Sequence, residues 1–338
     1  MASFAAPAAS SRFERLGSLS VEAQWLANFA SPCTRRAYAA DVGDFVDFCG
    51  VDSSDDLLQV GRSHVLAWRH HLEADGLSPS TQRRKLAALS SLLEHLVDER
   101  LIPSNPARGV RRPRLESHEG KTPALSLDQA RALLDAPDPQ SPKGIRDRAI
   151  LAVMLLGGLR RAEVVALRVK DFYLQRSGVQ HLRVLGKGGK VRFIPVPPLM
   201  RERVQRYLDL RGVAQQGDER LFVRLETREG KGGAGAGGRC ANATREGCDE
   251  AFRPTSASLS AGALATRVVR PYLAQIGVVG ERFSAHALRV TAATLALHAR
   301  ADLNEVRHFL GHACISTTTT YDRRARDAGT AVSLMLPL

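Results

Sequence analysis

A basic segment rich in proline divides the chain and constrains its fold more than any other feature. Residues 103–123 read PSNPARGVRRPRLESHEGKTP, with four prolines and a cluster of arginines, Arg108, Arg111, Arg112 and Arg114. Proline fixes φ and disfavours helix at the residue before it, so this segment predicts an extended linker. We expect separate domains on either side of it, over residues 18–102 and 124–338, and a loose tail over residues 1–17.

The N-terminal part has helical spacing of its apolar residues throughout, and two of its helices begin alike. Ser31-Pro32 and Ser78-Pro79 each combine an N-cap serine with proline at the first helical position. The first turns of both helices carry cations, namely Arg35, Arg36, Arg83, Arg84 and Lys85. Cations at this end oppose the helix dipole and would be stabilised by a phosphate backbone, although a solvated helix face would look similar. We predict that these residues, with Arg111 and Arg112, contact DNA.

The C-terminal part predicts a mainly helical domain that contains a small antiparallel sheet. A capping box over residues 126–129 starts one helix, and a strongly apolar helix is expected from about Asp147 to Leu156, where two glycines end it. The segment VQHLRVLGKGGKVRFIPV predicts two strands joined by a glycine-rich turn. Helical patterns resume at Ser260 and lead to an apolar C-terminal tail.

A change of composition over about residues 227–249 interrupts this domain. The segment consists mainly of Gly, Ala, Arg and Lys, which predicts a flexible insertion. It lacks the order of glycines, lysine and hydroxyl residue that makes a phosphate-binding loop. No nucleotide cofactor is therefore expected.

The charge of the chain favours a polyanionic partner. The formal net charge is +13, from 48 Lys+Arg against 35 Asp+Glu, and residues 1–115 hold 14 of these cations and 13 of the acids. Nearly all of the excess thus lies in the C-terminal part, and nucleic acid is the first candidate partner. No apolar run approaches the roughly 20 residues that span a bilayer, so we expect a cytoplasmic protein without a membrane partner. The five scattered cysteines form no C-x-x-C pair, which predicts reduced thiols and no zinc site.

The stretch Ser284–Tyr321 concentrates chemically active side chains in short helical segments. It reads SAHALRVTAATLALHARADLNEVRHFLGHACISTTTTY. His286 and Arg289 are three residues apart and therefore share one helix face. His312 follows a glycine that predicts a helix end, and Tyr321 closes a run of threonines.

Together with Arg160 and Lys187 upstream, these residues suit a metal-free transesterification of a phosphodiester. Two arginines can clamp the phosphate oxygens and stabilise the extra charge of the transition state. A lysine can protonate the leaving oxygen, and histidines can act as general base or as hydrogen-bond donors. A tyrosine hydroxyl is a nucleophile that stores the bond energy in a covalent intermediate.

The order and spacing of these residues resemble the tyrosine recombinase (phage integrase) family, including its Xer type. GLRRAE is similar to the first arginine box, GKGGK to the hairpin lysine, HALR to the H-x-x-R box and LGH to the second histidine, with the tyrosine after it. Upstream, TRRAY is similar to the N-terminal core-binding domain, so the likeness runs from about residue 20 to about residue 325. The insertion is longer than the connection expected in the family.

The resemblance implies a helical SAM-like core-binding domain followed by a catalytic domain of the DNA breaking-rejoining fold. It implies that Arg160 and Arg289 bind the scissile phosphate and that Tyr321 attacks it to form a 3′-phosphotyrosyl link. The resemblance likewise implies that Lys187 protonates the 5′-oxygen and that His286 assists proton transfer.

The resemblance also assigns His312 a hydrogen bond to the phosphate, and it places Glu163 behind the site as a supporting residue. The partners that it implies are double-stranded DNA, a homotetramer on two sites or a heterotetramer with a related recombinase, and accessory DNA-bending proteins. The function that it implies is site-specific recombination, as a recombinase or integrase that exchanges strands between two DNA sites, in a bacterial cytoplasm on the nucleoid.

Several alternatives remain open at the level of sequence. Lys190 could replace Lys187, because both flank the turn. His308 and His312 are four residues apart and could suggest zinc, but no H-E-x-x-H motif is present. The chain could also be a DNA-binding member of the fold that does not cleave, or a relaxing enzyme of the type IB topoisomerase kind.

Overall fold

The computed structural model describes residues 20–114, 122–215, 217–227, 252–280, 282–312 and 316–319. The chain forms two compact units, Met1–Ser117 and His118–Leu338. The expected tail over residues 1–17, most of the insertion and the C-terminal tail lie outside the described residues. No helix among the described residues is long and apolar enough to cross a membrane.

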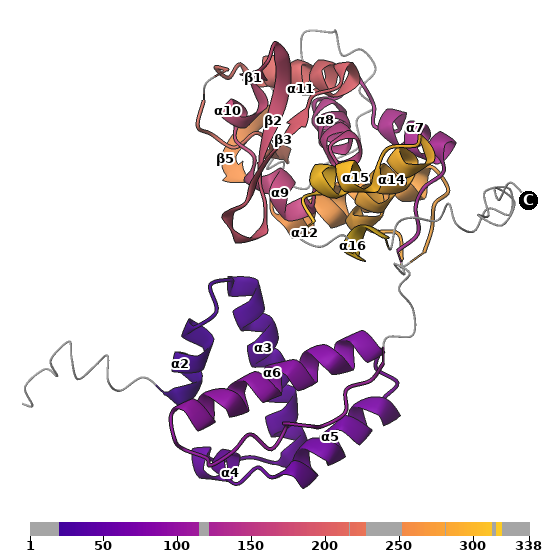
Figure 1. The fold of residues 1–338 in the computed structure, drawn as a ribbon. Coiled ribbons are helices and arrows are strands. Elements are labelled where there is room, and N and C mark those ends of the chain that lie inside the picture. The colour runs from indigo at the N-terminus through magenta and orange to yellow at the C-terminus, as the bar shows by residue number, and fades with distance from the viewer. Residues whose placement is uncertain are drawn as a thin grey trace, which may run out of the picture. The chain divides into compact units, whose positions relative to one another are not determined.

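The first unit is entirely helical in its described part (Figure 1). Its helices are α2 (Val21–Ala27), α3 (Pro32–Cys49), α4 (Ser54–Leu58), α5 (Arg62–Ala74) and α6 (Pro79–Asp98). Both serine–proline helix starts are confirmed, because the Ser31 hydroxyl accepts from the Thr34 amide and the Ser78 hydroxyl from the Thr81 amide. The caps and the prolines therefore set where α3 and α6 begin.

Aromatic and leucine side chains fill the core of the first unit. Phe45 of α3 packs edge-on against Trp68 of α5, with ring centroids 5.1 Å apart. Five leucines of α6 belong to the same core, namely Leu86, Leu89, Leu92, Leu93 and Leu96. The segment that follows α6 contributes Ile102 and Val110 to the same buried cluster. Asn105 donates from Nδ2 to the Ser90 carbonyl at 3.0 Å. The start of the segment expected to be an extended linker is therefore packed against the helices.

The second unit is mainly helical and contains two small antiparallel sheets (Figure 1). Its first half holds α7 (Leu127–Asp135), α8 (Pro142–Leu156), α9 (Arg161–Ala166), α10 (Val169–Phe172), β1 (Leu174–Arg176), β2 (Val179–Leu185), the 3-10 turn η1 (Lys187–Gly189), β3 (Val191–Pro195) and α11 (Pro198–Arg211). Its second half holds β4 (Val223–Thr227), β5 (Phe252–Ser258), α12 (Ala261–Ala263), the π-helical turn η4 (Leu264–Val269), α13 (Arg270–Gln275), α14 (Ala285–His298), α15 (Leu303–Leu310) and α16 (Ser316–Thr319). The fold class expected from the sequence is confirmed.

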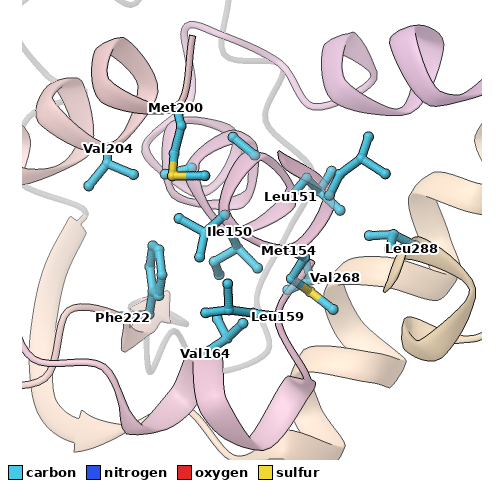
Figure 2. Packing of buried hydrophobic residues seen from close by; sticks show 14 of the residues in the cluster. Ile150, Leu151, Met154, Leu159, Val164, Met200, Val204, Phe222, Val268 and Leu288 are labelled. Atoms are coloured by element: carbon cyan, nitrogen blue, oxygen red, sulfur yellow. The ribbon is translucent and has the colours of Figure 1, made fainter. Parts of the chain in front are cut away.

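Helix α8 forms the centre of the second unit. Figure 2 shows Ile150, Leu151 and Met154 packed among residues of several other segments, including Leu288 of α14. The expected start of α8 at Asp147 was wrong, because the helix begins at Pro142, with Ser141 as its N-cap. The first turn of α8 is polar, so the apolar pattern of the sequence did not reveal where the helix begins. Asp147 is fully buried and accepts from Lys143 at 2.9 Å.

The three-stranded sheet has the order β1-β2-β3, and both pairings are antiparallel. Leu182 lies opposite Ile194 and Leu185 opposite Val191, which confirms the predicted hairpin. Strand β1 was not expected, and it adds three residues at the edge. Along β3, Arg192 and Ile194 face inward, while their neighbours are exposed. The hairpin thus directs an arginine toward the interior.

Candidate active site

Arg160 lies at the start of α9 and is held there by Glu163. Its backbone amide donates to Glu163 Oε2 at 2.8 Å, and its guanidinium donates to Glu163 Oε1 at 2.8 Å. Both bonds run from Arg160 to the Glu163 carboxylate, so a buried acid three residues into the chain from the N-cap fixes that N-cap residue. Arg160 remains 37% exposed, so its guanidinium is anchored on one side and accessible on the other.

Arg192, on β3, binds the same carboxylate. Its Nη1 donates to Glu163 Oε1 at 2.9 Å and its Nη2 to Glu163 Oε2 at 2.8 Å, which is the paired geometry that a guanidinium makes with a carboxylate. Its Nε also donates to the Phe309 carbonyl, at 3.1 Å, near the end of α15. Figure 1 shows α9 and α15 beside the β2–β3 hairpin, and Arg192 joins these three elements.

Arg289 is the most deeply buried arginine of this group, at 1% exposure. It projects from α14 and donates to the Gly158 carbonyl at 2.7 Å and to the Leu310 carbonyl at 2.5 Å. Its Nη1 lies 4.0 Å from Glu163 Oε2. Gly158 has φ of +58°, and a Cβ there would lie 2.9 Å from the Phe309 ring, so this close approach of backbone to α15 requires glycine.

The ionisation of Glu163 is fixed by these arginines. Burial alone would raise its pKa, but the hydrogen bonds from Arg192, the Arg160 amide and the Arg160 guanidinium outweigh burial and lower the pKa to about 2. Glu163 is therefore a carboxylate at any physiological pH. Within the part of the chain that the structure describes, ion pairs join Arg160, Arg192 and Arg289 to this carboxylate.

A cavity of about 410 Å³ opens beside Arg160 and Arg289. The first turn of α14 also lines it, including His286 and the N-cap residue Ser284. Burial lowers the pKa of His286, and the nearby charges of Arg289 and Arg160 lower it further. The imidazole is consequently neutral at physiological pH and able to accept a proton.

His312 lies just beyond α15, where Gly311 ends the helix with φ of +67°. It is buried, and its Nδ1 is 3.0 Å from the Thr318 hydroxyl of α16. Burial, followed by the charges of Arg289 and Arg160, lowers its pKa to about 4. His312 is therefore neutral near pH 7, and Thr318 connects it to the helix that ends two positions before Tyr321.

Models of two families match the chain, and together they span most of it. The Phage integrase family model matches residues 123–327, and the model described as Phage integrase, N-terminal SAM-like domain, matches residues 23–100. The chain belongs to the phage integrase family. Tyrosine recombinase XerC of Pelobacter propionicus is 32% identical over 88% of this chain and 86% of its own length. XerC of Myxococcus xanthus is 31% identical over 86% of this chain and 87% of its own length.

Structures of integrase-family proteins share the fold. The XerH recombinase in a post-cleavage complex with a palindromic difH substrate has a TM-score of 0.66 at 19% identity, covering 90% of this chain and 81% of that one. A lambda integrase dimer bound to a COC′ core site has a TM-score of 0.59 at 16% identity, covering 86% and 95%. With the XerC relatives, these matches identify a Xer-like tyrosine site-specific recombinase. The alternatives of a non-cleaving binding protein and a topoisomerase-like enzyme are not favoured.

The structure brings together five of the seven residues that the sequence marked for the integrase site. These are Arg160, Glu163, His286, Arg289 and His312. Lys187 begins η1 at the tip of the hairpin, but its side chain, like Tyr321, lies outside what the structure describes. The rival Lys190 is exposed. Among the described residues, no group of three or more His, Cys, Asp or Glu could hold a metal ion.

Arg192 belongs to the cluster around Glu163, and the sequence analysis missed it. A signal for it was present, because Arg192 alternates with exposed residues on a strand and so had to face inward. A buried arginine requires an acidic or carbonyl partner, and Glu163 lies 29 residues upstream. The pairing follows from the fold.

The cations predicted to contact DNA have three kinds of surroundings in the structure. Arg35, Arg36, Arg111 and Arg112 are exposed. Arg84 and Lys85 instead form ion pairs with Asp41 and Asp44 of α3, and Lys85 is buried. Arg83 donates to the Pro113 carbonyl at 3.1 Å, which holds the middle of the basic segment against α6.

Proposed function

We propose that this recombinase cleaves DNA by attack of the Tyr321 hydroxyl on a phosphodiester, forming a 3′-phosphotyrosyl intermediate. Arg160 and Arg289 bind the non-bridging oxygens of the phosphate, and His312 donates a hydrogen bond to one of them. The P–O bond to the 5′-oxygen breaks as the P–O bond to tyrosine forms. Reversal with a different 5′-hydroxyl joins the strand to its new partner.

The observation that carries this proposal is the cavity beside Arg160 and Arg289, where positive charge exceeds negative. Three arginines surround one carboxylate, so the cluster retains a net charge of two. The cavity is also lined by the first turn of α14, a helix end that favours anions. A phosphate in this cavity would gain charge in the transition state, and fixed cations stabilise such charge without reorganisation.

Proton transfer in the proposed reaction falls to His286 and Lys187. His286 has a lowered pKa and can accept the tyrosine proton, directly or through a water molecule. Lys187, at the tip of the hairpin, protonates the 5′-oxygen as it leaves. Because the arginines supply the positive charge, the proposal includes no cofactor.

We further propose that the protein acts as a tetramer on two DNA sites in the bacterial cytoplasm. The support is the likeness to bacterial XerC proteins and the fold shared with a lambda integrase tetramer bound to a Holliday junction, which has a TM-score of 0.60. The exposed cations of the first unit and the basic segment are proposed to bind the phosphate backbone, so binding should weaken as salt is raised.

The decisive experiment uses a nicked suicide substrate that contains the protein's own site, in excess chelator. We expect the wild-type protein to form a covalent protein–DNA adduct and Tyr321→Phe to form none. Tyr173→Phe is the matched control, since Tyr173 donates to Gln205 at 2.9 Å away from the cavity, and it should form the adduct normally. An adduct with Tyr321→Phe, or none with the wild type, would refute the proposed mechanism.

A further inference from the structure

Arg192 makes contacts that no role assigned above requires. Its guanidinium binds both oxygens of Glu163, at 2.9 and 2.8 Å, and its third nitrogen binds the Phe309 carbonyl. The side chain is only 11% exposed, and it does not line the cavity beside Arg160. A largely covered cation with all three nitrogens engaged in this way acts on its neighbours and is not placed to bind a substrate in that cavity.

We infer that Arg192 is a positioning residue that holds Glu163, and through it Arg160 and Arg289, in the geometry that binds the scissile phosphate. This inference rests on the proposed function. Arg192 lies on β3, and its contacts join this strand to Glu163 and to the last turn of α15.

The charge balance explains why such a residue is needed. Glu163 must be ionised to hold the Arg160 amide and guanidinium, yet its charge also attenuates the field that Arg160 and Arg289 present to a phosphate. Arg192 offsets that charge and occupies one lone pair on each oxygen. Glu163 can then orient Arg160 without neutralising the site.

The packing around Arg192 points in the same direction. A Cβ on Gly311 would lie 3.1 Å from Arg192 Cδ, so the arginine stem lies directly against the residue before His312. The bond to Phe309 fixes the last turn of α15 beside it. One side chain on β3 therefore also holds the backbone that presents His312.

The test compares Arg192→Gln with Arg192→Lys and with the matched control Arg183→Gln. Arg183 lies on the neighbouring strand and pairs with Asp171 at 3.1 Å, outside the site. We expect cleavage of the suicide substrate by Arg192→Gln to fall roughly 100-fold, the effect of a misplacement of about 1 Å. Cleavage by Arg192→Lys should fall less, because lysine keeps the positive charge but lacks the planar guanidinium that binds both oxygens of Glu163. Arg183→Gln should cleave like the wild type.

A substrate with sulfur in place of the 5′-bridging oxygen separates this role from a purely structural one. The sulfur leaves as a thiolate and needs no proton, since thiols ionise near pH 8.5. Lys187→Ala should therefore regain cleavage on the sulfur substrate. Arg192→Gln should stay equally slow on both substrates, because its defect lies in phosphate binding. Rescue of Arg192→Gln by sulfur, or an unchanged rate on the oxygen substrate, would overturn the inference.

The double variant Glu163→Gln/Arg192→Gln shows through which residue Arg192 acts. If Arg192 works through Glu163, the double variant should be no slower than the slower single variant. Independent losses that multiply would contradict this route. Gel-shift binding and urea unfolding verify that each variant is folded, and if Arg192→Gln is not, Arg192→Lys carries the same comparison.

The pH profile gives a second readout. The charged groups facing Glu163 are Arg160 beside it, Arg192 of β3 and Arg289 of α14. Without Arg192 the pKa of Glu163 rises, so Arg192→Gln should lose cleavage at acid pH more steeply than the wild type, and the double variant should not. If wild-type protein forms no adduct, the proposed function fails. If it does and Arg192→Gln matches it, only this inference fails.

Discussion

Both units bring cations and carboxylates together, but in different proportions. In the first unit, Arg84 and Lys85 of α6 face Asp41 and Asp44 of α3, two charges of each sign. In the second, Arg160, Arg192 and Arg289 surround Glu163. The first arrangement is balanced and fastens one helix to another. The second leaves positive charge beside a cavity, which suits it to an anionic substrate.

The largest expected effect comes from disturbing the unbalanced cluster. Arg289→Lys keeps the charge but cannot donate to both the Gly158 and Leu310 carbonyls, because a lysine lacks the planar fork. We expect cleavage of the suicide substrate to fall about 10²–10³-fold, as for the loss of one preorganised donor. DNA affinity by gel shift should change little, and a cleavage rate within a few-fold of the wild type would contradict the assigned role.

His312 should make the free energy of unfolding of the second unit depend on pH. Its pKa falls from 6.5 to about 4 on folding, so the unfolded chain takes up the proton first. The stabilisation is complete above pH 6.5 and is lost as the pH falls toward 4, amounting to about 3 kcal/mol. Urea unfolding followed by circular dichroism should show this loss in the wild type and a weaker one in His312→Gln. Equal slopes in the two proteins would argue against a neutral buried His312.

The balanced cluster of the first unit should respond in stability. Asp41→Asn removes the buried carboxylate that Arg84 and Lys85 share, and we expect a loss of about 1–3 kcal/mol. Both tryptophans of the chain, Trp25 and Trp68, lie in this unit, so tryptophan fluorescence in urea reports its unfolding in the full chain. Asp47→Asn, an exposed position on the same helix, should stay within about 0.5 kcal/mol of the wild type.

The smallest expected effect distinguishes exposed from paired cations in DNA binding. Arg35→Ala and Arg36→Ala should each weaken binding and reduce the slope of log affinity against log salt by about one. Arg84→Ala, which removes a cation already paired with Asp41, should alter that slope less. Equal changes at all three positions would show that the pairing opens when DNA binds.

The sequence predicted much of the fold because the signals were local. Serine followed by proline marked the starts of α3 and α6, and Gly311 marked the end of α15. Ser141 and Pro142 carry the same serine–proline signal, but a long apolar run follows them. The predicted start of α8 coincided with that run, five residues after the observed start. Strand β1 escaped notice because three residues are too few for an alternating pattern.

The site was predictable for residues that lie in recognisable short motifs and not for the others. Arg160, His286, Arg289 and His312 stand at the family's spacings, and the structure places them together. Arg192 has its partner 29 residues away, on a different element. Arg84 and Lys85 were treated as DNA contacts like their neighbours, because nothing local indicates the acids on α3.

By itself, the sequence determined where α3 and α6 begin and where α15 ends, the excess of positive charge in the second unit, and the order of the reactive residues. These properties depend on neighbours within a few positions or on simple counts. Only the tertiary structure decided which cation meets which carboxylate, since ion pairing depends on distances between residues far apart in the chain. That decision separates Lys85, a link between two helices, from Arg160, which faces an open cavity.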